Sequence, residues 1–214
     1  MSRLFPQPEP SALSGADLGS YRHVMAGLHG LMKRSEWQGQ SDYAGSESEE
    51  GGFQVGGYYG ALLTSPPLAE RLYEMSRFYR QCEERGAFPA SFREFTNVVL
   101  AVELGYRAVL PGHIPFARSV GVRAEAIRAV LTGSESELDD SERRQVDYIR
   151  AVARGGVQDG DFKAMSELLG DRGCLEYTAF ICYLVHHLRL MQAIGVPEPE
   201  PAELDAILAP YLEA

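Results

Sequence analysis

The stretch that decides the fold runs from residue 91 to residue 121 and reads SFREFTNVVLAVELGYRAVLPGHIPFARSVG. It opens with an almost wholly apolar segment whose hydrophobic side chains recur every three or four residues, as on the buried face of an α-helix. A turn at Gly105 separates this segment from a second one, in which His113 stands among apolar residues. Glu94 lies 113 − 94 = 19 residues before His113. One acid and one imidazole on successive helices predict a buried proton-transfer pair.

Helical periodicity recurs through the rest of the chain, and no segment alternates cleanly with a period of two. We therefore expect an all-α fold, with Asp17 as the N-cap of the first helix. The serine- and glutamate-rich residues 46–52 are expected to form a mobile loop. The expected helices cover about residues 17–37, 66–85, 92–104, 112–120, 124–132, 139–154, 161–169 and 174–194, with a final amphipathic helix after Pro197.

Composition limits the partners. The 214 residues suffice for one domain with extensions, and the net charge is −10 with 20 scattered Lys and Arg. Nucleic acids and anionic membranes need clustered positive charge, so neither is an expected partner. The N-terminus has no apolar run behind a basic start, and a cytoplasmic protein without a secretion signal is expected.

Residues 174–194 form the longest apolar segment and raise the possibility of a membrane span. Glu176, His186, His187 and Arg189 interrupt it, and ionisable groups at bilayer depth are costly. A buried core helix or a subunit-interface helix is therefore expected.

The cysteines do not form a redox motif. Cys82, Cys174 and Cys182 are odd in number and none belongs to a C-x-x-C pair, so a disulfide framework is not expected. We expected Cys174 and Cys182 to be buried, because both lie on the apolar segment.

Four pieces of sequence match one family. GYYGALLTSP at 57–66, the pair Arg93-Glu94, HIPFA at 113–117 with its closing Gly121, and Gly195-Val-Pro resemble segments of the carboxymuconolactone decarboxylase and alkylhydroperoxidase D-like superfamily. The resemblance implies an all-helical domain at residues 55–197 that assembles as a trimer or hexamer. Residues 1–54 then form an N-terminal arm, helix and mobile loop, and residues 198–214 a C-terminal linker and helix.

Two positions of the family pattern differ here. The peroxidase branch has cysteines seven and four residues before the histidine, where this chain has Tyr106 and Val109, so a thiol nucleophile is missing. The decarboxylase branch usually has Glu-Trp four and three residues before the histidine, where this chain has Val109 and Leu110.

The site residues have structural alternatives. Ser91-x-x-Glu94 fits a capping box, in which Glu94 would bind the Ser91 amide. His113 could instead bind a backbone carbonyl, and Tyr106 could simply be the last apolar step of its helix. The resemblance implies that Tyr58 and Tyr59 line the pocket.

Arg118 could bind a substrate carboxylate or remain a solvated charge. His186 and His187 are adjacent and point about 100° apart on a helix, so they cannot chelate a metal together. Neither a metal nor a cofactor is therefore expected.

These observations predict a cofactor-free lyase of the carboxymuconolactone decarboxylase-like class, acting by decarboxylation or isomerisation on a small unsaturated acid or lactone. His113 would be the general acid and base, Glu94 its partner and Tyr106 a donor to a developing enolate. The alternatives are a peroxidase-like antioxidant protein that lacks the C-x-x-C pair, and a non-catalytic oligomer that binds an apolar ligand.

Overall fold

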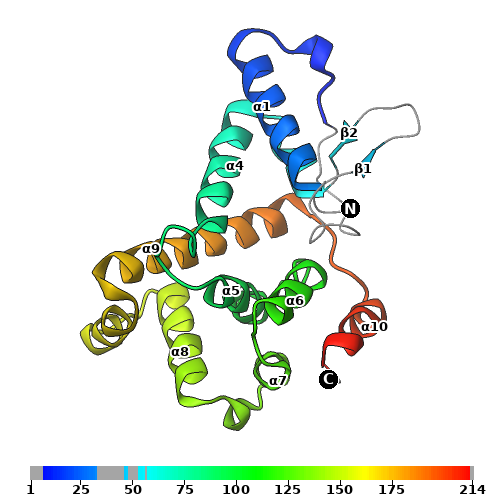
Figure 1. Ribbon diagram of the computed structural model, residues 1–214. Helices are drawn as coiled ribbons and strands as arrows, with labels where there is room; N and C mark the ends of the chain where they lie inside the picture. Colours follow the sequence, from blue (N-terminus) through cyan, green and yellow to red (C-terminus); the bar gives the residue numbers. More distant parts are fainter. Residues whose placement is uncertain (1–6, 33–45, 48–52, 56, 213–214) are drawn as a thin grey trace. The chain divides into compact units, whose positions relative to one another are not determined.

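The computed structural model describes residues 7–32, 46–47, 53–55 and 57–212, and it confirms the all-α class (Figure 1). The described part is helical apart from one antiparallel ribbon, in which Ser46 pairs with Gln54 and Glu47 with Phe53. The elements are η1 (Pro10–Ala12), α1 (Gly15–Met32), β1 (Ser46–Glu47), β2 (Phe53–Gln54), α3 (Gly57–Leu62), α4 (Pro66–Arg80), α5 (Ala90–Glu103), α6 (Leu110–Ser119), α7 (Ala124–Thr132), η3 (Glu135–Glu137), α8 (Asp140–Arg154), α9 (Asp159–Ile194) and α10 (Pro201–Leu212).

Two local predictions at the N-terminal end need correction. The first helix begins at Gly15, so Asp17 lies inside its first turn and is not the N-cap. Part of the expected loop at 46–52 is paired, because Ser46 and Glu47 form β1, while residues 48–52 lie outside the described residues. Residues 33–37 of the first expected helix also lie outside them.

Capping chemistry sets the ends of α8. Asp139 Oδ1 accepts hydrogen bonds from the amides of Ser141 and Glu142 at 2.8 Å each, and Glu142 Oε2 accepts one from the Asp139 amide at 2.9 Å. This reciprocal pattern is a capping box, which satisfies amides that a helix start leaves without partners. At the other end Gly155 takes a positive φ of 71°, which ends the helix.

The two helices expected at 161–169 and 174–194 form one element, α9, with a break between them. Gly170 has φ 72° and ψ 164° inside it, a conformation that a side chain would strain. The predicted boundary at Gly170 is therefore confirmed as a sharp bend between two legs. No helix in the described part of the chain has the length and apolarity that a membrane span requires.

The chain divides into two compact units. The first comprises Met1–Phe78 with Ala193–Pro197, and it contains α1, α3 and most of α4. Within it α1 and α4 are joined by a hydrogen bond from Ser20 to Glu70 (2.5 Å) and by the contact between His23 and Glu74 (2.6 Å). The division predicted from the sequence, at residues 54 and 197, stays a prediction.

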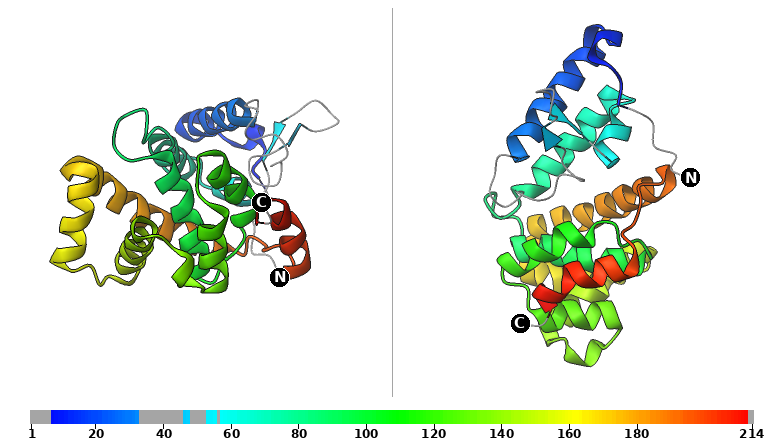
Figure 2. Two further views of the ribbon diagram at one scale, coloured as in Figure 1. Left: turned by 60° about the horizontal axis from the view of Figure 1, so that its bottom comes forward. Right: turned by 90° about the vertical axis from the view of Figure 1, so that its right-hand side faces the viewer.

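The second unit comprises Tyr79–Gln192 with Glu198–Ala214, and α5 is its central helix. α5 packs against α6, α7 and α8, and α10, at the red end of the colour bar, lies beside α6 and α7 (Figures 1 and 2). Because α5 is covered on several sides, most of its residues are buried, including a glutamate, Glu94.

A buried polar network joins three helices of this unit. The hydroxyl of Tyr177 on α9 lies 2.9 Å from Thr96 Oγ1 on α5, and it accepts a hydrogen bond from Gln145 Nε2 on α8 at 2.9 Å. Burial raises the pKa of Tyr177 well above its usual range, so the phenol stays neutral. The network therefore adds hydrogen bonds to the core without burying a charge.

A close approach of Gly173 to a backbone carbonyl in this unit gives a stability prediction. A Cβ at Gly173 would lie 2.4 Å from the carbonyl oxygen of Ala87 and 3.0 Å from Leu169 Cβ. Gly173→Ala is therefore expected to lower the free energy of unfolding by about 1–3 kcal/mol, because a backbone carbonyl cannot move aside cheaply.

Gly160→Ala on the same helix is the matched control, since a Cβ there meets nothing within 4 Å. Denaturant unfolding of the two variants measures the difference. Equal stabilities would contradict the close approach of Gly173 to Ala87.

Candidate functional site

The second unit brings Glu94 and His113 together. α5 ends at a turn in which Gly105 has a φ of 62°, and the Tyr106 amide donates to the Ala101 carbonyl at 2.9 Å. The chain then enters α6, whose fourth residue is His113. His113 Nδ1 lies 2.7 Å from Glu94 Oε2, so the two side chains are within the predicted hydrogen-bond reach. The apolar pocket expected beside them stays a prediction.

The capping interpretation of Glu94 is wrong. α5 begins at Ala90 after Pro89, whose extended backbone makes it the N-cap, so Ser91 is already inside the helix. Glu94 is the fifth residue of α5 and is 3% exposed. Its carboxylate points to its partners in the core instead of to the helix start.

Arg93 holds the second oxygen of the carboxylate. Arg93 Nε donates to Glu94 Oε1 at 2.8 Å, and Arg93 Nη1 donates to the carbonyl of Arg80 at 2.6 Å. Each oxygen of Glu94 therefore has its own donor, which fixes the rotation of the carboxylate. Sequence reasoning noted Arg93 only as part of the matched pair and missed this role.

Electrostatics decides the state of the pair. Burial acts to raise the pKa of Glu94, but His113 and Arg93 outweigh it, and the pKa lies below the usual glutamate range. An ionised carboxylate can only accept hydrogen bonds, so His113 Nδ1 carries the proton of the 2.7 Å contact. In the neutral ring this leaves the lone pair on Nε2, the nitrogen able to take a proton.

A second imidazole belongs to the surroundings of His113. His187 on α9 is 4% exposed, and burial, followed by electrostatic interaction with the His113 and His186 imidazoles, lowers its pKa to about 3. His187 is therefore neutral at physiological pH. The sequence analysis treated it only as half of a metal pair, because no pattern of spacing shows which of two adjacent histidines is buried.

Tyr106 is buried, and Arg118 binds a backbone carbonyl. Tyr106 is buried, and burial, with the nearby Glu198 carboxylate, raises its pKa above the usual tyrosine range. Arg118 Nη1 donates to the Val122 carbonyl at 2.8 Å, which closes the end of α6. The predicted roles of both side chains toward a substrate stay predictions.

Tyr58 and Tyr59 lie on α3 in the first unit. Both are buried, and their rings meet edge to face with centroids 5.4 Å apart. This geometry is typical of a packed aromatic pair. Their predicted role in lining the site of His113 stays a prediction.

Burial distinguishes the three cysteines. Cys82 is fully buried, and burial raises the pKa of its thiol in spite of the nearby Arg93. Cys174 is buried as expected, but Cys182 is exposed, so the expectation that it lies inside is wrong.

Within the described ranges, no group of three or more His, Cys, Asp or Glu side chains is arranged to hold a metal ion. No protein-family model, no curated protein and no solved structure matches this chain.

Proposed function

We propose that the protein is a cofactor-free proton-transfer enzyme of the carboxymuconolactone decarboxylase-like class, with an alkylhydroperoxidase D-like helical fold. It would act as a lyase or isomerase on a small unsaturated acid or lactone. The observation that carries the proposal is the 2.7 Å contact between His113 Nδ1 and the buried carboxylate of Glu94. A carboxylate that orients an imidazole is a recurrent arrangement for general acid–base chemistry.

The chemistry follows from the orientation of the ring. In isomerisation, His113 Nε2 takes a proton from a carbon next to the substrate carbonyl and returns it at another carbon. In decarboxylation, the electron pair of the breaking C–C bond passes into the enolate as CO₂ leaves, and protonated His113 delivers a proton to carbon. Glu94 stabilises the imidazolium in both cases, and Tyr106 is the proposed donor to the enolate oxygen.

Arg93 is a positioning residue in this scheme. Its bonds to Glu94 and to the Arg80 carbonyl hold the carboxylate at the angle that His113 requires. The proposed substrate-binding side chains are Tyr58, Tyr59 and Arg118.

We also propose assembly into a trimer or hexamer. Large apolar side chains are exposed on α4 and α9, and a neighbouring subunit would remove them from water. The side chains proposed for this interface are Leu68, Met75, Phe78, Phe162 and Leu175.

The test is a panel of small unsaturated acids and carboxylated γ-lactones incubated with the full chain in D₂O. Proton NMR records deuterium entering the carbon next to the carbonyl and the loss of CO₂. Turnover of at least one compound is expected, and His113→Gln should lower it by about 10²–10⁴-fold. His186→Gln is the matched control, because it removes an imidazole on the exposed side of α9.

Two other outcomes would overturn the proposal. Peroxide consumption with a dithiol donor, unaffected by His113→Gln, would favour the antioxidant alternative. Binding of panel compounds without deuterium uptake or CO₂ loss would favour a non-catalytic binding protein.

A further inference from the structure

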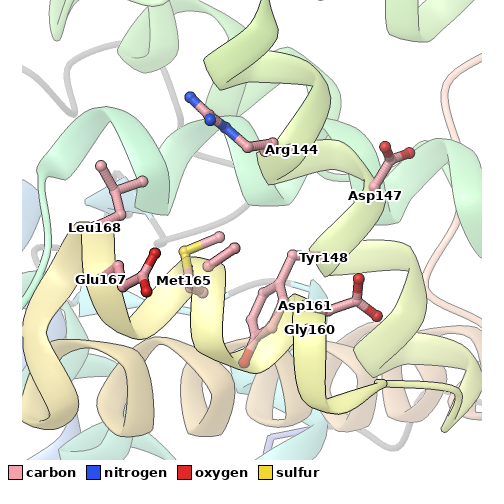
Figure 3. A pocket seen from close by; sticks show the side chains of 9 residues that line it. Arg144, Asp147, Tyr148, Gly160, Asp161, Met165, Glu167 and Leu168 are labelled. Carbon is pink, nitrogen blue, oxygen red and sulfur yellow. The ribbon is translucent and has the colours of Figure 1, made fainter.

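A pocket of about 370 Å³ opens in the second unit between α8 and the first leg of α9 (Figure 3). This volume is in the range of small-molecule sites. None of the Glu94, Arg93 and His113 side chains lines it, so it is separate from the proton-transfer pair.

The inner wall of the pocket is apolar and fixed. Met165 and Tyr148 line it, and both are buried, with 3% and 2% exposure. The Tyr148 hydroxyl is held 2.5 Å from Thr178 Oγ1, so the ring cannot swing into the space. Gly160 leaves room, because a Cβ there would meet nothing within 4 Å.

The charged groups of the lining are mostly acidic. Asp147, Asp161 and Glu167 contribute three carboxylates and Arg144 one guanidinium, and Lys163 Nζ lies 3.8 Å from Glu167 Oε1. Asp161 Oδ2 accepts a hydrogen bond from the Gln158 amide at 3.0 Å, which fixes this carboxylate at the start of the helix. The lining therefore has a net negative charge beside an apolar wall, and it attracts a positive group more than a negative one.

Apolar contact continues to the rim. Leu168 lines the pocket and is 50% exposed, so its side chain is open to a ligand. In Figure 3 the side chains of Leu168, Met165 and Glu167 lie at one end of the pocket, and those of Asp147 and Asp161 lie at the other. Because Glu167 is paired with Lys163 at 3.8 Å, the Leu168 end offers mainly apolar contact and the other end offers carboxylates. A ligand with a cationic head and an apolar body fits this lining.

We propose that this pocket binds a small organic cation with an apolar body, a protonated amine. The ammonium group lies against Asp147 and Asp161, and the apolar part lies against Met165 and Leu168. The proposal does not depend on the function proposed for His113, because the two sites share no residue.

The test uses three probes of one length and different head charge: hexylammonium, hexanol and hexanoate. Each is titrated into the ¹⁵N-labelled full chain, and shifts of the α8 and α9 amide signals give the affinity. Hexylammonium is expected to bind with a dissociation constant of about millimolar, more tightly than hexanol, while hexanoate binds weakest.

Matched variants locate the binding. Gly160→Trp should abolish hexylammonium binding by filling the pocket, whereas Gly156→Trp, outside the lining at a position where a Cβ also meets nothing within 4 Å, should leave it unchanged. Asp147→Asn should weaken binding about threefold to tenfold. The same change of charge at the exposed Glu84, Glu84→Gln, should have no effect.

Three results would overturn the proposal. They are hexanol or hexanoate binding as tightly as hexylammonium, Gly160→Trp binding like the wild type, and no shift of the α8 and α9 signals with any probe. None of them bears on turnover at His113, which the D₂O assay measures separately.

Discussion

Replacing Glu94 with glutamine is expected to lower turnover of the active panel compound by about 10²–10⁴-fold. The amide cannot stabilise an imidazolium, because it carries no charge. The glutamine oxygen accepts the hydrogen bond from Arg93 Nε, and its NH₂ group then faces His113 Nδ1 as a donor. A donor at this place favours the tautomer in which Nδ1 accepts and Nε2 carries the proton. That tautomer has no lone pair on the nitrogen proposed to act as the base.

A double-mutant comparison separates this effect from general damage. Because Glu94 is proposed to act through His113, the variant carrying both Glu94→Gln and His113→Gln should be no slower than His113→Gln alone. Thermal unfolding of each variant gives its folded fraction at the assay temperature, and the rates are then compared per folded molecule. Additive losses would show that Glu94 acts independently of His113.

The second large effect concerns stability in acid. His187 has a pKa of about 3 in the fold against an ordinary value of 6.5. Between these values the unfolded chain binds a proton at residue 187 and the folded chain does not, so the free energy of unfolding falls as the pH falls. The slope is up to about 1.4 kcal/mol per pH unit, or about 5 kcal/mol over the 3.5 units.

The window from pH 6.5 to 4.5 isolates this contribution. The pKa of Glu94 is lowered, so the stability that its ionised carboxylate contributes is lost only as the pH falls below the ordinary pKa range of glutamate. His187→Gln should remove about 2–3 kcal/mol of pH dependence in this window, whatever its effect on stability at pH 7. His186→Gln removes only the smallest of the three causes that lower the His187 pKa, so most of the slope should remain. An unchanged slope in His187→Gln would show that His187 is accessible to protons.

The sequence predicted the helical class because its information is local. The apolar period of residues 92–104 predicts α5, Gly170 predicts the break in α9, and Asp139 predicts the start of α8. Each of these signals depends only on residues that are near one another in the sequence. The capping box at Ser91 was predicted wrongly for the same local reason. Pro89 is the N-cap instead of Ser91, so α5 begins at Ala90, two residues earlier than a capping box at Ser91 predicts.

The site was predicted only in part. Glu94 and His113 were identified because an acid and an imidazole are conspicuous in an apolar segment. The position of Arg93 beside the Glu94 carboxylate depends on its hydrogen bond to the Arg80 carbonyl, and the neutral state of His187 depends on burial by other helices. Neither property produces a recognisable spacing of residues, so neither could be predicted from the sequence.

The most direct test of the central claim is the position of the proton on the His113 ring, read from imidazole ¹⁵N chemical shifts in the full chain. We expect the neutral ring to carry its proton on Nδ1, which faces Glu94, and its lone pair on Nε2. In Glu94→Gln the proton of the neutral ring should move to Nε2. A neutral wild-type ring with its proton on Nε2, or a tautomer that Glu94→Gln leaves unchanged, would contradict the proposed proton-transfer pair.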